Sequence, residues 1–226
     1  ARLMAGEPLS NFPRREPYPE TENPMDVLPL GDAFTLADPH TPWFSVKEAV
    51  LPFARFPGVD TILGPEMRST GEVMGWDRSF PRAFLNAQMG AGTDLPTSGT
   101  VFISIKDADK TADMIEASQI LLNLGFNIVG TRGTTAWLIK NQISCETVNK
   151  VYEGGLTIVD RLKDGHIALV FNTTEGSQAV EDSREIRAVA LYDKIPYFTT
   201  AAASHAAALA MQAREEGDIG VRSLQG

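Results

Sequence analysis

The stretch from Gly130 to Leu138 carries the groups best suited to binding an anion. An apolar run at Phe126–Val129 precedes it and a helix-compatible run follows, so the hydroxyls of Thr131 and Thr134 fall where a strand turns into a helix. The first amides of a helix lack carbonyl partners and carry a partial positive charge. Threonine hydroxyls can donate to phosphate oxygens beside them. The stretch therefore predicts a phosphate site; the alternative is that Thr131 or Thr134 only caps an ordinary helix.

Similar polar groups follow the other expected strands. They are Ser104 and Lys110 after the first strand, Lys150 near the third, Asn172, Thr173 and Thr174 after the fourth, and Thr199 and Thr200 after the fifth. Lysine supplies charge, hydroxyls donate, and Asn172 can both donate and accept, so the set suits a phosphate and sugar hydroxyls. Alternatively, Lys110 and Lys150 are ordinary solvated charges. Asp182, in a predicted helix, is either a solvated carboxylate or a partner for a ribose hydroxyl.

The strand ends offer no base for proton abstraction, which needs a positioned histidine or carboxylate. The three histidines lie elsewhere, before a strand, in an alanine-rich helix and in a proline-rich segment: His166, His205 and His40. Cys145 is the only cysteine, so no internal disulfide or cysteine-based zinc site can form. Glu66 and Glu72 have no neighbouring ligands and make a poor metal site. We therefore expect no catalytic residue, metal or cofactor in this chain.

From Gly99 onward, short β-like runs alternate with helical ones. We expect strands at Thr100–Ile105, Asn127–Val129, Ile167–Phe171, Tyr197–Thr200 and Gly220–Leu224, with a short one near Glu146–Lys150. We expect helices at Asp107–Leu124, Thr134–Asn141, Thr157–Lys163, Ser177–Tyr192 and Ala201–Arg214. This alternation predicts an α/β fold with a mostly parallel sheet of about five strands and helices on both faces, which is a Rossmann-like three-layer arrangement. In such sheets ligands bind at the carboxyl ends of the strands.

The first part of the chain has a different composition. Residues 1–41 begin like the end of a helix and continue as a proline-rich, acidic segment with little periodicity, so we interpret them as a linker or arm. Residues 42–97 hold a dense group of aromatic and apolar side chains interrupted by prolines, which we interpret as packed but irregular structure that docks on another domain. Residues 98–226 form the regular domain.

The length, net charge and hydropathy of the chain limit the kinds of partner that it can have. The 226 residues suffice for one or two domains, and the net charge of −9 argues against nucleic acid as a partner. A few lysines can still make one pocket of an acidic protein positive. The sequence holds no apolar run long enough to span a membrane and no export signal, so we expect a cytoplasmic protein without a membrane partner.

Three runs resemble the large chain of carbamoyl-phosphate synthases. They are Phe44–Phe53 (FSVKEAVLPF), Phe56–Asp60 (FPGVD) and Leu63–Gly75 (LGPEMRSTGEVMG). They are similar to the segment that joins the second ATP-using half of that enzyme to its C-terminal regulatory domain, and the region from about Gly99 resembles the regulatory domain, whose fold is methylglyoxal-synthase-like. The resemblance implies a role in ATP- and glutamine-dependent synthesis of carbamoyl phosphate for arginine and pyrimidine production. The ATP, the Mg or Mn ion, the catalytic half and the glutaminase small chain would belong to the full enzyme.

The resemblance also implies sites. Regulatory domains of this family bind nucleotide effectors such as uridine or inosine monophosphate, and the matching positions here are Ser104, Lys110, Thr131, Thr134, Lys150, Asn172, Thr174 and Asp182. A Tyr-x-Thr pattern that contributes to an ornithine site is matched by Tyr197 and Thr199. Arg132 stands where relatives commonly have histidine, and the longer helix after Lys110 makes that lysine the weakest match.

Two other functions compete with effector binding. Methylglyoxal synthase shares the fold and the phosphate cradle but needs an aspartate in a turn that reads Gly154-Gly155-Leu156 here, without a carboxylate. The domain could alternatively serve assembly alone, without binding any effector. The cradle residues favour a domain that senses a nucleotide.

Overall fold

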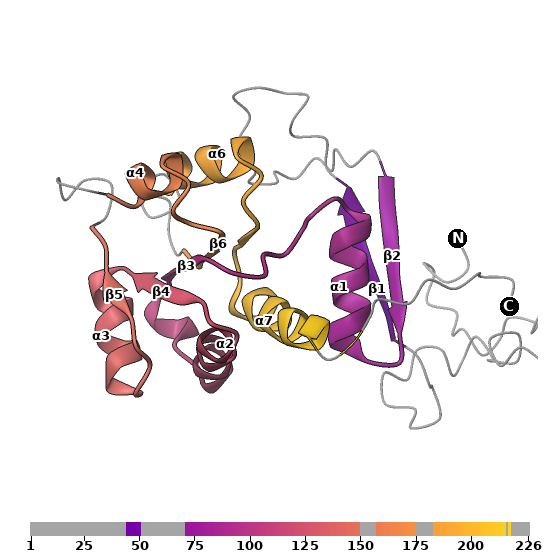
Figure 1. The fold of residues 1–226 in the computed structure, drawn as a ribbon, viewed down its shortest axis with the longest axis horizontal. Coiled ribbons are helices and arrows are strands. Elements are labelled where there is room, and N and C mark those ends of the chain that lie inside the picture. Colours follow the sequence, from indigo (N-terminus) through magenta and orange to yellow (C-terminus); the bar gives the residue numbers. More distant parts are fainter. Residues whose placement is uncertain (1–43, 51–70, 150–156, 175–182, 216, 218–226) are drawn as a thin grey trace, which may run out of the picture. The chain divides into compact units, whose positions relative to one another are not determined.

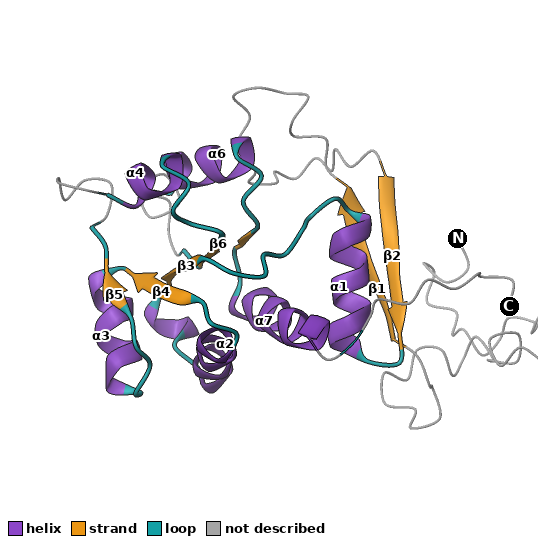
Figure 2. Cartoon of the chain, in the orientation of Figure 1, coloured by secondary structure: helices purple, strands orange, loops and turns teal. Residues whose placement is uncertain are grey.

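Five short strands form one parallel sheet in the order β5-β4-β3-β6-β7 (Figures 1 and 2). The structure is a computed structural model and describes residues 44–50, 71–149, 157–174, 183–215 and 217. The strands are β3 (Thr100–Ser104), β4 (Asn127–Gly130), β5 (Glu146–Thr147), β6 (Leu169–Asn172) and β7 (Tyr197–Phe198). They are the five expected strands between residues 100 and 200, so the predicted α/β class is confirmed. The strand expected at 220–224 and the arm at 1–41 lie outside the described residues.

Helices cover both faces of this sheet, which confirms the three-layer arrangement. One face carries α4 (Ile158–Lys163) and α6 (Arg184–Tyr192), and the other carries α2 (Ala112–Asn123) and α7 (Ala201–Glu215). In Figure 1, α4 and α6 lie above the strands, and α2 and α7 lie below them. α3 (Arg132–Lys140) follows β4 directly and contributes Leu138 to the same core as α2 and α7. No helix among the described residues is both long and apolar enough to cross a bilayer.

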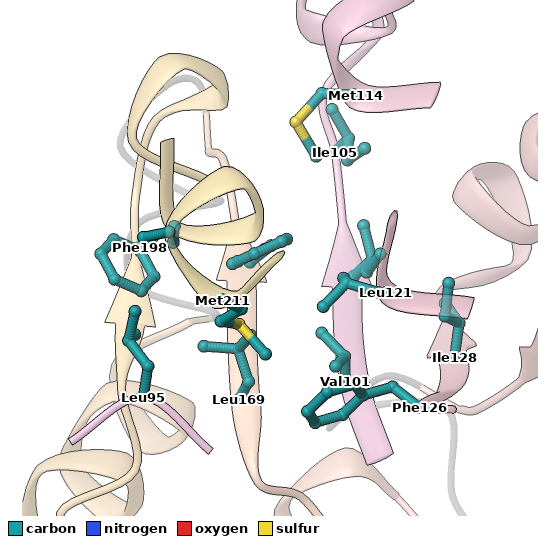
Figure 3. Close-up of a cluster of buried hydrophobic side chains, with 14 of the residues drawn as sticks. Leu95, Val101, Ile105, Met114, Leu121, Phe126, Ile128, Leu169, Phe198 and Met211 are labelled. Atoms are coloured by element: carbon teal, nitrogen blue, oxygen red, sulfur yellow. The ribbon is translucent and has the colours of Figure 1, made fainter. Parts of the chain in front are cut away.

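Alternating side chains of the central strand divide the core in two. Val101 and Ile103 of β3 pack with the α2 and α7 side, whereas Phe102 between them packs with the α4 and α6 side. This is the two-residue period of a strand that is buried on both faces. Figure 3 shows the larger cluster, in which Met114 of α2 lies beside Ile105. The two clusters hold the strand ends in fixed positions.

The helix expected at Asp107–Leu124 is in fact two elements. A short 3-10 turn, η5, spans Asp107–Asp109 and has Lys110 as its C-cap residue. The helix α2 begins at Ala112, with Thr111 as its N-cap residue. Lys110 has ψ 71°, which is not helical and interrupts the backbone between them. The prediction of one continuous helix was therefore wrong, and Lys110 lies in the break.

Other boundaries differ by a few residues. α3 starts at Arg132 because Thr131 is its N-cap residue, whose carbonyl accepts from the Thr135 amide at 2.8 Å. β7 stops at Phe198, two residues early, because the Thr200 hydroxyl accepts from the Ala203 amide at 3.1 Å and so belongs to the start of α7. Residues 175–182, where the helix before Tyr192 was expected to begin, lie outside the described residues.

Part of the segment 42–97 is regular, which corrects the irregular structure expected there. β1 (Phe44–Val50) pairs antiparallel with β2 (Gly71–Asp77), and α1 (Phe80–Gly90) packs on this pair and against α7. Most of the prolines that suggested irregular structure lie between the two strands, in 51–70, outside the described residues. Pro81 stands in the first turn of α1, where a helix tolerates proline. The division between residues 42–97 and 98–226 stays a prediction.

α1 lies unusually close to β2 at Gly75. A Cβ atom at Gly75 would overlap the Ala83 carbonyl oxygen and the Ala87 amide nitrogen of α1. The same face holds Gln88, buried at 5% exposure, whose Nε2 donates to Glu48 Oε2 of β1 at 2.9 Å. Close contact and one partly buried hydrogen bond therefore hold α1 on the strand pair.

Replacing Gly75 by alanine should destabilise the protein by about 1–3 kcal/mol, because the added methyl group forces α1 away from β2. The matched control is Gly71→Ala at the start of β2, where an added Cβ meets no atom of the described residues within 4 Å. Urea unfolding of both variants measures the difference. Equal midpoints for the two variants would show that α1 does not need this close approach.

The carboxyl group of Glu48 should make stability depend on pH. Burial raises its pKa above the ordinary value, and the Gln88 hydrogen bond only partly offsets this. Because the folded-state pKa exceeds the unfolded-state pKa, the folded protein holds this proton more tightly, and stability falls as the pH rises through the folded pKa. Glu48→Gln keeps an acceptor for Gln88 but does not ionise. Its unfolding midpoint relative to the unmodified protein should therefore rise as the pH increases above about 4. A constant difference would contradict the assignment.

Candidate functional site

The carboxyl ends of β3 and β4 meet beside a hollow of about 320 Å³. The two strands are parallel neighbours with Ile103 opposite Gly130, so the residues after each strand face one another. The hollow is lined by Ser104, Ile105, Lys106, Asp107, Lys110, Thr131, Arg132, Gly133 and Thr134. Four of the predicted site residues, Ser104, Lys110, Thr131 and Thr134, are therefore brought together.

The two threonines form a buried hydrogen-bonded pair. Thr131 and Thr134 are 7% and 1% exposed, and Thr131 Oγ1 donates to Thr134 Oγ1 at 3.2 Å. Thr134 Oγ1 also accepts from the Ile105 amide at 3.0 Å, which joins the start of α3 to the chain after β3. Thr134 thus has a structural role beside any contact with a ligand.

The N-cap side chain of α3 does not cap its first turn. Thr131 occupies the N-cap position, as the alternative interpretation expected, but its hydroxyl makes no capping hydrogen bond. An added Cβ at Gly133 would meet no atom within 4 Å, so this turn is also open. The Thr131 hydroxyl therefore does not occupy the first amides of α3, where the helix dipole favours an acceptor with negative charge.

Lys110 ties η5 to the start of α3. Its ammonium nitrogen donates to Asp107 Oδ1 at 2.7 Å and to the Gly133 carbonyl at 3.3 Å. The lysine side chain is only 18% exposed, whereas the Asp107 side chain is 95% exposed. The hydrogen bond and the charge of Lys110 lower the pKa of Asp107, so this carboxyl group is ionised at neutral pH. The match for Lys110 was the weakest in the sequence, yet the residue lines the hollow.

Charge on the lining is mainly positive. Lys106, Lys110 and Arg132 are cations, and Asp107 is the one carboxylate among the lining residues. Lys106 is fixed by its amide, which donates to Thr173 Oγ1 at 3.1 Å. A protein of net charge −9 therefore carries a local cationic hollow, which suits a small anion.

A second group of predicted residues lies at the end of β6. Asn172, which pairs with Ser104 of β3, is 3% exposed and uses its Nδ2 to donate to Ser183 Oγ at 3.1 Å and to Tyr197 Oη at 2.6 Å. Thr174 is half-buried and Thr199 is exposed. None of these four predicted residues, Asn172, Thr174, Tyr197 and Thr199, lines the hollow.

Two predicted positions are not described, and several lining residues were not predicted. Lys150 and Asp182 lie outside the described residues. Beyond the predicted site residues, the lining adds Ile105, Lys106, Asp107, Arg132 and Gly133. Lys106 could have been found as a cation directly after a strand, and Asp107 from its spacing of three residues from Lys110. Ser183, the acceptor for Asn172, carries only the weak signal of a hydroxyl before a helix.

No group of three or more His, Cys, Asp or Glu side chains gathers as metal ligands would in the parts of the chain that the structure describes. Cys145 is half-buried, and burial raises its pKa, with a partial offset from the Thr135 hydrogen bond. The thiol therefore stays protonated at neutral pH, which does not favour a nucleophilic role.

Comparison with known proteins agrees with this geometry. Residues 113–199 match the family model of the MGS-like domain, a range that includes α3, its threonines and the end of β6. The chain is 45% identical over its whole length to the carbamoyl phosphate synthase large chain of Mesorhizobium japonicum. It is homologous to this family of large chains. The predicted resemblance is thus confirmed.

Other large chains of the family show similar identity. The chain is 45% identical to the Brucella suis protein over 225 residues, and 50% identical to the Xanthomonas axonopodis pv. citri protein over 177 residues, or 78% of this chain. It spans only 18% of the length of the Mesorhizobium and Brucella proteins and 16% of the Xanthomonas protein. The activity of those complete enzymes therefore extends to this chain only as a proposal.

Replacing Thr134 by valine should destabilise the protein by about 1–3 kcal/mol, because the buried Ile105 amide loses its acceptor. The matched control is Thr199→Val, the same change at an exposed residue, which should alter stability by less than about 0.5 kcal/mol. Urea unfolding compares them. An unchanged midpoint for Thr134→Val would mean that the hydroxyl does not link β3 and α3.

Proposed function

We propose that this chain is the effector-binding, C-terminal part of a carbamoyl phosphate synthase large chain. In this proposal the hollow beside α3 takes the phosphate of a nucleoside monophosphate of the uridine or inosine type. Ser104, Lys110, Thr131 and Thr134 would surround the phosphate, and Lys150, Asn172, Thr174 and Asp182 would serve the rest of the nucleotide. The proposal excludes a catalytic residue in this chain.

One observation carries the proposal. The Thr131 side chain at the N-cap makes no hydrogen bond to the first turn of α3, and the Lys110 ammonium lies 3.3 Å from the Gly133 carbonyl of that same turn. Open helix amides and a lysine ammonium together provide several donors and a positive charge for one phosphate group. The buried threonine pair fixes where these donors stand. A hollow of about 320 Å³ leaves room for a phosphate and part of its sugar.

Binding would regulate the complete enzyme by changing an equilibrium between states. A ligand can shift such an equilibrium only by its different affinity for the two states, typically about 1–3 kcal/mol. We propose that the catalytic half of the same large chain receives this change, and that a glutaminase small chain completes the enzyme. The carbamoyl phosphate made by the complete enzyme would then serve arginine and pyrimidine synthesis. ATP and the Mg or Mn ion would bind outside this segment.

The same proposal assigns Tyr197 and Thr199 to an ornithine site shared with the catalytic half. Support comes from their place on the edge strand, since Tyr197 begins β7 and the exposed Thr199 directly follows it. The Tyr197 hydroxyl accepts from Asn172, a proposed effector residue, so the two proposed sites are one hydrogen bond apart. Charged partners for the amino acid would come from the catalytic half.

Lys110→Gln should weaken binding of uridine or inosine monophosphate about tenfold or more, because a charged hydrogen bond to phosphate contributes about 1.5–3 kcal/mol. Lys140→Gln is the matched control, since it removes the same charge from the last turn of α3, at the far end of that helix. Its affinity should stay within about twofold of the unmodified protein. Titration calorimetry with each nucleotide and with inorganic phosphate measures both.

Two results would oppose the proposal. Equal affinities in Lys110→Gln and the unmodified protein would place the phosphate elsewhere. No heat from any protein at millimolar nucleotide would instead favour an assembly domain without an effector.

A further inference from the structure

We propose that Asp107 is an internal competitor for the anion that this hollow binds, holding Lys110 in this structure and leaving it when a phosphate arrives. The inference rests on the proposed function and deepens it, because it concerns the regulation of affinity at the same site. It assigns a role to a residue that the sequence pattern did not single out.

The contact between the two side chains is the first support. Asp107 Oδ1 lies 2.7 Å from Lys110 Nζ, well within the range of a charged hydrogen bond. The same ammonium donates to the Gly133 carbonyl at 3.3 Å, so at least two of its three donors are engaged by the protein itself. A phosphate that needs this ammonium must therefore share it with the aspartate or displace the aspartate.

The exposure of the two partners indicates which of them moves. Lys110 is held between η5 and α3 with 18% of its side chain exposed, whereas Asp107 has 95% of its side chain in solvent. Asp107 is the first residue of a three-residue turn and is one of the residues that line the hollow. The carboxylate can swing into water at little cost, while the ammonium stays at the hollow.

Electrostatics also favours exchange. Lys110 lowers the pKa of Asp107, so at neutral pH the aspartate is a full negative charge at the lysine. A phosphate dianion carries more charge and more acceptor oxygens than a carboxylate, and the α3 amides attract it as well. The aspartate thus reduces the affinity for phosphate without preventing binding.

The test compares two substitutions on the same turn in the full-length protein. Asp107→Asn removes the competitor, while Asp109→Asn removes an equal charge from a residue whose carboxylate lies 3.9 Å from Lys106 Nζ. Calorimetry with inorganic phosphate at fixed ionic strength measures the dissociation constants. Asp107→Asn should bind phosphate about two- to fivefold more tightly than the unmodified protein, the range expected for releasing a surface ion pair, and Asp109→Asn should gain less.

Each outcome decides. Unchanged or weaker binding in Asp107→Asn, with phosphate bound by the unmodified protein, would overturn the competitor role and leave the proposed function standing. Equal gains in the two variants would also overturn it, because they would show a general charge effect. Phosphate binding that is detected only in the Asp107→Asn variant would give the strongest support to the competitor role of Asp107. No binding by any of the three proteins would overturn both the competitor role and the phosphate site.

Discussion

The close approach of β4 to its neighbours at Gly130 is the constraint on which the site depends. A side chain at Gly130 would press within 3.0 Å of the Ile103 carbonyl, 3.1 Å of Thr135 Oγ1 and 3.3 Å of Cys145 Sγ. Because Gly130 has no side chain, the end of β4 can approach both β3 and the first turn of α3 closely. From this contact follow the hydrogen bond from Ile105 to Thr134 and the position of the α3 amides beside the chain that leaves β3.

The break after η5 is the second feature that shapes the hollow. A continuous helix from Asp107 would carry Lys110 along the surface of its first turn, as a solvated charge. Instead the non-helical backbone at Lys110 lets the side chain reach the Gly133 carbonyl across the hollow. The local concentration of three cations in a protein of net charge −9 is therefore a product of backbone geometry as well as of composition.

The end of β6 forms a separate but adjoining polar network. Asn172 pairs with Ser104 in the sheet, and its amide group is directed toward Ser183 and Tyr197. A buried amide that makes both hydrogen bonds fixes its neighbours firmly. Ser104 lines the hollow and Tyr197 begins the edge strand, so the sheet itself connects the two groups of proposed ligand residues.

Much of this arrangement was evident in the sequence. Apolar runs of four or five residues, separated by amphipathic stretches, predict the three central strands and the helices on both faces, because strands buried on both faces are apolar throughout. The glycines and threonines of 130–134 predicted a strand-to-helix turn with donors at its start. The acidic residues and prolines before residue 98 concealed β1, β2 and α1, since strand pairing and packing at Gly75 overrode weak local preference.

From Gly99 onward, the sequence by itself determined the alternation of strands and helices along the chain and the residue types at the strand ends, because hydrophobic period and chain direction are local properties. Only the tertiary structure decided which of those residues share a hollow. The Lys110 ammonium donates to the Gly133 carbonyl 23 residues away, and the Asn172 amide donates to the Tyr197 hydroxyl 25 residues away. Such contacts depend on strand register and on a break in one helix, and both arise from packing between elements that are distant in the sequence.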